Sequence, residues 1–155
     1  MRVLCVDPGE KRIGLAISDP NGVVARPLTI LDHVSRDEDA REIVALAESM
    51  EVGLIVVGVP YDLGIEIGPA ARRALRLAEA IRNITPIPVA TWDESGSTQR
   101  VQALLREMGH SRKKRREPLD HRAAAIILQD FLDTQATLKK DLSGKGSSKQ
   151  GDQFV

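Results

Sequence analysis

The amino-acid sequence predicts an α/β fold with a mixed five-stranded sheet, three antiparallel strands first and then two parallel ones, flanked by helices. Three observations predict it. Two apolar runs, residues 3–6 and 13–17, flank a tight turn, and a third extended stretch follows at residues 23–31. Helical and strand patterns then alternate to the end of the apolar sequence. The chain has 155 residues, of which 42% are hydrophobic, so it suits one domain with a substantial core.

The first two strands form a predicted β-hairpin around Asp7. The stretch VLCVDPGEKRIGLAISD, residues 3–19, places a Pro-Gly turn between two apolar runs, which is the usual hairpin signal. Aspartate is depleted in strands, yet Asp7 closes a strand whose sequence is typical of one buried on both faces. A charge at that position needs a partner, and a metal cation is the obvious one.

A helix and a parallel strand are predicted next. Ser35 begins the helix, and Glu38 three residues later completes a capping-box pattern. We expect Gly53 to end this helix. The apolar run at residues 54–57 is typical of a central parallel strand, and a loop is expected from Gly58 onward.

The remaining elements continue the alternation. Pro69 begins a second helix, and residues 87–92 form the fifth strand, which ends in Asp93-Glu94. A third helix is expected at about residues 97–108. A fourth helix is expected from Pro118 to about Leu138. We therefore predict one domain over residues 1–138.

Charge is distributed unevenly along a chain whose net charge is zero. Residues 1–99 contain 10 basic and 15 acidic side chains, whereas residues 100–116 contain 7 basic and 1 acidic. Residues 139–155 are almost all polar or glycine, so we expect a disordered tail.

Composition also argues against several classes of protein. No apolar run approaches the roughly 20 residues of a membrane span, so we expect no membrane partner. The single cysteine, Cys5, excludes an intramolecular disulfide and fits a reducing cytoplasm. Because the chain enters its first strand at once, we expect no signal peptide. Cys5 lies in the middle of a predicted strand, where a core residue is expected rather than a nucleophile.

Three carboxylates are candidates for chemistry. Asp7 and Glu94 follow the carboxyl ends of predicted strands, where ligands bind in open α/β sheets. Asp120 precedes Ala124, Ile127 and Phe131 at helical spacing, so it shares their apolar face. An acidic residue in a first helical turn is commonly explained by the helix dipole alone, and that explanation would be preferred if Asp120 stood by itself. Two further carboxylates expected at the same edge favour a functional role.

Converging carboxylates repel one another, and divalent cations relieve that repulsion. Mg²⁺ takes one or two carboxylates together with waters and substrate phosphate oxygens. Two such ions about 3.5 to 4 Å apart can activate a water and stabilise the leaving oxygen of a phosphodiester. The pattern therefore predicts Mg²⁺ or Mn²⁺ held by Asp7, Glu94 and Asp120.

Two basic segments are candidates for nucleic-acid binding. Lys11 and Arg12 follow the first turn, where phosphate contact and a solvated turn are equally good explanations. The second segment leads directly into the helix of Asp120, which favours nucleic-acid binding over a solvated loop. It consists of Arg112, Lys113, Lys114, Arg115 and Arg116. Aromatic residues are scarce, so binding should depend on the phosphate backbone and on salt.

Several motifs together resemble one family. They are VDPGEKRIGLAISD, GVPYDLGIEIG, the acidic pair after the fifth strand, and DHRAAAIILQDFLD. In this order, and over most of residues 2–133, they resemble the YqgF family, also called RuvX, a branch of the Holliday-junction-resolvase-like, ribonuclease H-like superfamily. The resemblance implies a ribonuclease H-like fold and a metal-dependent nuclease that matures the precursor of small-subunit ribosomal RNA. Some relatives are credited with cleaving Holliday junctions.

The resemblance also implies roles for individual residues. Asp7 matches the catalytic aspartate of the first strand, Glu94 matches the glutamate of a D-E-R-L-T-T motif, and Asp120 matches the aspartate of a D-x-x-A-A helix. The sequence departs from the family at Ser95-Gly96, where the family has Arg-Leu.

The predicted function is therefore a cytoplasmic, metal-dependent nuclease acting on structured RNA. The alternatives are a Holliday junction resolvase acting on branched DNA and a catalytically weak nucleic-acid-binding module. A resolvase cuts two strands symmetrically and should be a homodimer, whereas RNA processing is compatible with a monomer or a homodimer. The sequence also resembles the phosphate loops of sugar kinases, but those enzymes need two such domains and this chain has length for one.

Overall fold

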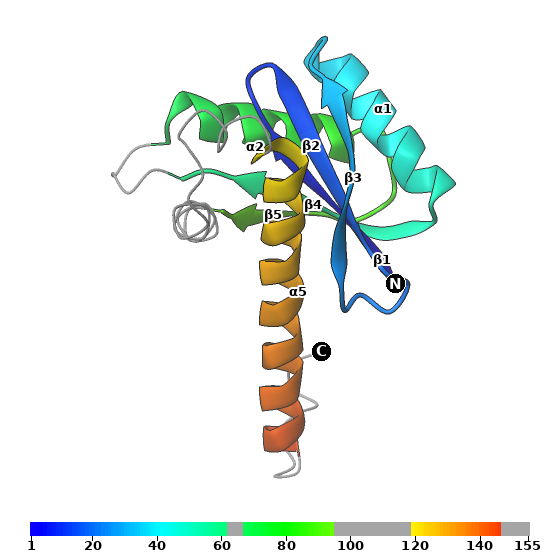
Figure 1. Cartoon of the computed structure of the whole chain (residues 1–155), viewed down its shortest axis with the longest axis vertical. Helices are drawn as coiled ribbons and strands as arrows, with labels where there is room; N and C mark the ends of the chain where they lie inside the picture. The colour runs from blue at the N-terminus through cyan, green and yellow to red at the C-terminus, as the bar shows by residue number, and fades with distance from the viewer. Residues whose placement is uncertain (62–66, 95–118, 147–155) are drawn as a thin grey trace.

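The computed structural model of the chain describes residues 1–61, 67–94 and 119–146 (Figure 1). Its centre is one five-stranded sheet of order β3-β2-β1-β4-β5. The strands are β1 (Arg2–Pro8), β2 (Arg12–Ser18), β3 (Ala25–Asp32), β4 (Val52–Val59) and β5 (Val89–Asp93). The strands β1, β2 and β3 form an antiparallel meander, while β4 runs parallel to both β1 and β5. The predicted mixed sheet is therefore confirmed.

Helices cover both faces of the sheet. The helices are α1 (Arg36–Ser49), α2 (Pro69–Arg82) and α5 (Leu119–Gly146). Alternation along β1 divides its side chains between the two layers. Leu4 and Val6 pack with α1 and α2, whereas Val3 and Cys5 pack with α5. Since both faces are covered, residues 3–6 of β1 are apolar and β4 consists of apolar residues and glycine, as buried parallel strands require.

The start of α1 confirms the predicted cap, but its end does not lie at Gly53. Ser35 Oγ accepts the backbone N–H of Glu38 at 3.2 Å. The helix ends with Met50 as its C-cap, and Glu51 takes the left-handed conformation with φ 54°. Gly53 belongs to β4, where a Cβ atom would collide with the side chain of Met1. The absence of a side chain at Gly53 therefore allows Met1 to pack against the start of β4, and the glycine does not end the helix.

Two further boundaries differ from the sequence prediction. Strand β4 continues through Gly58 to Val59, residues we expected in a loop, and pairs there with Trp92 and Asp93 of β5. Helix α5 continues past its expected end at about Leu138 to Gly146, into the segment expected to be disordered. The expected helix at residues 97–108 lies outside the described residues. The domain boundary at residue 138 stays a prediction.

The turn between β2 and β3 is organised by Asp19. Its carboxylate accepts backbone N–H groups from Asn21, Val23 and Val24, at 3.2, 2.7 and 2.8 Å. The hydrogen bonds from Val24 and Val23 hold the pKa of Asp19 below its usual range.

No helix in the described part of the chain is long and apolar enough to cross a bilayer.

The hydrogen bonds to the Asp19 carboxylate predict how the stability of the protein changes with pH. Because the folded-state pKa of Asp19 is lowered, its contribution to stability is present above the unfolded-state pKa and is lost as pH falls through the folded-state value. We expect Asp19→Asn to lower the thermal midpoint at pH 7 and to lose that difference progressively below about pH 4. Thermal unfolding from pH 7 to pH 2 measures this. A difference between the two proteins that is constant with pH would contradict the assignment.

Candidate active site

Asp7 lies at the carboxyl end of β1 on the sheet face that α5 covers. It follows Val3 and Cys5 at alternate positions along the strand, and both of those residues pack against α5. The Asp7 residue is half-buried, and its strand is hydrogen-bonded on both sides, to β2 and to β4. The carboxylate is therefore carried by the end of a strand that is paired on both sides.

Glu94 reaches the same place from the end of β5. Its backbone N–H donates to the carbonyl oxygen of Val59 at 3.1 Å, which continues the β4–β5 pairing by one residue. The Glu94 residue is only 6% exposed, and its carboxyl is hydrogen-bonded to Asp7. Its Oε2 atom is buried and has no hydrogen-bond partner within the described residues.

The surroundings of Glu94 disfavour its charge. Burial raises the pKa of the Glu94 carboxyl, the hydrogen bond with Asp7 lowers it, and the charge of Asp93 raises it. The net direction is upward. Asp7 and Glu94 are thus in contact, and one buried oxygen of Glu94 has no donor among the described residues. A cation bound here would contact that oxygen and reduce the repulsion between the two carboxyl groups.

Gly58 provides the space that Glu94 occupies. A Cβ atom at position 58 would collide with Glu94 Oε2 and would lie 3.6 Å from Ile127 Cδ1. The strand end of β4 thus forms a cradle, bounded by Ile127 of α5, into which the carboxylate fits. The sequence places Gly58 at the end of a strand, on the edge where Asp7 and Glu94 are expected, but it does not predict that this glycine makes room for Glu94.

Cys5 lies on the same face, one alternate position before Asp7. It is completely buried, and burial raises the pKa of its thiol, with the charges of Asp7 and Glu94 adding to the effect. Cys5 is therefore a neutral core residue, as expected.

The third predicted carboxylate, Asp120, belongs to the first turn of α5, but its side chain lies outside the described residues. The backbone places it one turn before Ala124, which is fully buried, and Ile127 follows on the same face beside Gly58. This face of α5 therefore leads from the cradle toward Asp120.

The donor set fits a divalent cation. Within the part of the chain that the structure describes, no group of three Asp, Glu, His or Cys residues could hold a metal. Asp7 and Glu94 supply two carboxylates, and Mg²⁺ typically takes one or two from a protein. The buried, unpartnered Oε2 atom of Glu94 is the observation that supports this fit.

The predicted basic residues are only partly described. Lys11 lies exposed in the β1–β2 turn, and Arg12 is exposed at the start of β2. The run Arg112, Lys113, Lys114, Arg115 and Arg116 lies outside the described residues.

Among the aromatic residues, Trp92 donates its indole N–H to Asp130 at 3.2 Å and meets the ring of Phe131 edge-on, with centroids 5.2 Å apart. Trp92 thus anchors α5 to the sheet.

Comparisons with known proteins agree with this architecture. Residues 1–134 match the family RuvX, described as Holliday junction resolvase. A protein of Thermoanaerobacter pseudethanolicus named "Putative pre-16S rRNA nuclease" is 38% identical over 136 residues, covering 87% of this chain and 98% of the relative. A protein of the same name from Anaeromyxobacter sp. is 41% identical over 133 residues, covering 86% and 97%.

Solved structures show the same fold. Thermus thermophilus RuvC in complex with a Holliday junction substrate superposes with a TM-score of 0.53 at 17% identity, covering 88% of this chain and 96% of RuvC. A second structure of Thermus thermophilus RuvC gives a TM-score of 0.52 at 18% identity, covering 88% and 97%. The predicted ribonuclease H-like fold is confirmed.

Proposed function

The chain belongs to the RuvX family of nucleases, and from this membership we propose that it is a metal-dependent enzyme that processes the precursor of 16S ribosomal RNA. The family match confirms the predicted resemblance and the predicted nuclease class. The observation that carries the proposal is the carboxylate pair, Asp7 and Glu94, in which a buried oxygen of Glu94 has no partner among the described residues.

Asp7, Glu94 and Asp120 are the residues we propose to hold Mg²⁺ or Mn²⁺. The bound metal would supply an activated water and stabilise charge on the leaving oxygen of a phosphodiester, so no histidine base is required. The chain's own contribution is positioning. Asp7 is fixed by a strand paired on both sides, and Glu94 is fixed by its backbone bond to Val59 and by the space at Gly58.

Substrate binding is proposed to rest on phosphate contacts. Lys11 and Arg12 are exposed beside the end of β1, and their charges favour a polyanion at the edge where Asp7 lies. Arg112, Lys113, Lys114, Arg115 and Arg116 precede the helix of Asp120 in the sequence and are proposed to extend this contact. Affinity should therefore fall steeply with salt.

RNA processing is preferred because curated relatives that cover most of the chain bear that name. Ribosomal RNA is matured in the bacterial cytoplasm, which is the location we propose. Junction resolution is the second candidate, favoured by the fold shared with RuvC and by the family description. Resolution requires a homodimer, and a strictly monomeric protein in light scattering would count against it. The departure at Ser95-Gly96 motivates the third candidate, a binding module with weak catalysis.

A cleavage assay tests the proposal. The full chain is incubated with labelled precursor 16S ribosomal RNA, a generic single-stranded RNA and a four-way DNA junction, each with Mg²⁺, Mn²⁺ or a chelator. We expect metal-dependent cleavage of the precursor RNA, no cleavage with chelator, and none by Asp7→Asn under any condition. Preferred cleavage of the junction would replace the RNA proposal. Binding without cleavage would favour the binding module.

A further inference from the structure

A cavity of about 460 Å³ lies on the sheet face that carries α1 and α2. The carboxylate pair lies at the opposite face. The floor of the cavity is apolar, since its lining residues Pro8, Ile13 and Leu77 are buried. Its walls are the β1–β2 turn, the N-terminus of α1 and the N-terminal half of α2. This volume is in the range of pockets that hold small organic ligands.

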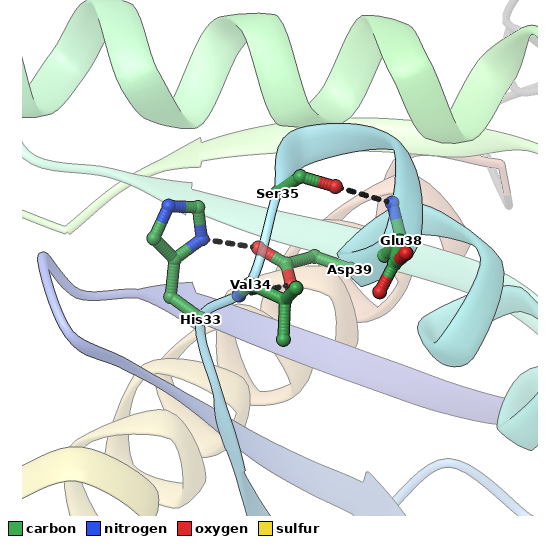
Figure 2. A network of polar contacts seen from close by, with 5 residues as sticks. All are labelled: His33, Val34, Ser35, Glu38 and Asp39. Carbon is green, nitrogen blue, oxygen red and sulfur yellow. Dashed lines mark hydrogen bonds and ion pairs between the residues drawn. The ribbon is translucent and has the colours of Figure 1, made fainter.

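The described lining of this cavity contains four arginines and one carboxylate, Asp39. That carboxylate already has partners of its own, because it lies 2.5 Å from His33 Nδ1 and accepts the backbone N–H of Val34 at 3.1 Å (Figure 2). None of the arginines forms an ion pair with a carboxylate in the described part of the chain. They are Arg36, Arg72, Arg73 and Arg76.

Arg73 shows most directly that an acceptor is missing. Its Nε atom is buried and has no hydrogen-bond partner among the residues that the structure describes. A buried charged donor without an acceptor is unfavourable, and native structures rarely retain one. Because Arg73 lines the cavity, an oxygen atom of a bound anion would supply the acceptor.

The placement of these charges is also unfavourable for α2 itself. Helix N-termini carry partial positive charge, yet Arg72 and Arg73 lie near the N-terminus of α2, whose first turn has no acidic residue. Arg72 and Arg76, four positions apart, repel each other on one helix face. Helix α1 shows the usual arrangement, with acidic residues in its first turn. A bound anion would offset the repulsion in α2.

We propose that this cavity binds the phosphate group of a nucleotide. Guanidinium groups bind phosphate oxygens in pairs, and the N-terminal end of α2, whose first turn has no acidic residue, favours negative charge. The volume and the apolar floor fit the remainder of a nucleotide and exceed what a small inorganic anion needs. The nucleotide is either free or part of an RNA chain. The inference does not depend on the proposed nuclease activity, since the cavity and the carboxylate pair lie on opposite faces of the sheet.

Calorimetry with the full chain in chelator tests this, so that cleavage plays no part. Adenosine 5′-monophosphate, adenosine and inorganic phosphate are titrated in turn. We expect saturable binding of the monophosphate, weakened roughly tenfold or more by loss of its phosphate or by Arg73→Met. Arg76→Gln, a change of an exposed residue, should weaken binding similarly. Arg82→Met is the matched control, because Arg82 lies at the other end of α2 and pairs with Glu79.

A second measurement separates ligand binding from a structural role of Arg73. Without ligand, Arg73→Met should keep or raise the thermal midpoint, because it removes a buried Nε atom that has no hydrogen-bond partner among the described residues. A short single-stranded RNA that displaces the monophosphate assigns the site to nucleic acid, whereas RNA that binds without displacing it assigns the site to free nucleotide. The proposal would be overturned if neither the monophosphate nor the RNA bound saturably, or if Arg73→Met and Arg76→Gln both left binding unchanged. It would also be overturned if inorganic phosphate bound as tightly as the monophosphate.

Discussion

Replacing Glu94 with glutamine is expected to abolish cleavage and, at the same time, to stabilise the metal-free protein. Cleavage should fall by roughly a thousandfold or more, because metal stabilisation of the transition state contributes several kcal/mol. The free energy of unfolding in chelator at pH 7 should rise by about 1 to 3 kcal/mol, because the substitution removes a buried charge whose Oε2 atom has no hydrogen-bond partner among the described residues. Glutamine can also donate a hydrogen bond to Asp7, which the glutamate carboxylate cannot.

The pH dependence of this stabilisation follows from the raised pKa of Glu94. A carboxyl whose folded-state pKa is above its unfolded-state value favours folding when protonated, and that contribution is lost as pH rises through the folded-state pKa. The advantage of Glu94→Gln should therefore be smallest in acid and should grow toward neutral pH. Urea unfolding at several pH values measures it.

The controls for Glu94→Gln use a second glutamate and a metal. Glu48→Gln, at an exposed position of α1, should change neither cleavage nor stability appreciably. Mn²⁺ should raise the thermal midpoint of the unaltered protein and should leave that of Glu94→Gln nearly unchanged. Undiminished cleavage, or a variant less stable than the unaltered protein in chelator, would contradict the assignment of Glu94.

Adding one methyl group at Gly58 is expected to slow cleavage roughly a hundredfold without unfolding the protein. The Cβ atom of Gly58→Ala would collide with Glu94 Oε2, the mobile end of a side chain, so the carboxylate should move and the backbone should not. A displacement of about 1 Å at a catalytic group costs roughly a hundredfold in rate. The free energy of unfolding should change by less than about 1 kcal/mol, because alanine loses less conformational entropy than glycine on folding.

Gly53→Ala is the matched control for this prediction. Gly53 lies in the same strand, and its Cβ atom would also meet a movable side chain, that of Met1, far from the carboxylate pair. We expect full cleavage activity from Gly53→Ala and similar stability in both variants. Equal cleavage rates in the two glycine variants would show that the space at Gly58 is irrelevant to catalysis.

The strands and the meeting of Asp7 with Glu94 could be predicted because both follow from local sequence and one topological rule. Apolar runs define β1 and β4, and the rule that parallel strands end at one edge brings the two carboxylates together. The structure places them in hydrogen-bond contact. Their catalytic roles remain a proposal, as does that of Asp120.

The roles of glycines could not be predicted, because they depend on atoms distant in the sequence. Gly53 resembled a helix terminator, yet Glu51 takes the left-handed conformation and the glycine admits the side chain of Met1. Gly58 resembled the start of a loop, yet it makes room for Glu94. In each case the deciding contact joins residues more than thirty positions apart, which no local pattern reports.

The arginine-lined cavity was missed for a related reason. Its charges come from two helices separated by a strand, and only the packing of α1 beside α2 assembles them. The one available signal was the set of three arginines at positions 72, 73 and 76, which puts like charges on one helical turn near a helix N-terminus.

The order in which the chain is synthesised determines when the carboxylate pair can exist. Asp7 is synthesised well before Glu94, and its hairpin with β2 can form from neighbouring residues. Glu94 arrives only after β4 has been inserted beside β1 and β5 beside β4. A nascent chain that ends before Glu94 contains only one of the two carboxyl groups that meet in the folded structure. The pair can therefore form only after Glu94 has been synthesised and both β4 and β5 have joined the sheet.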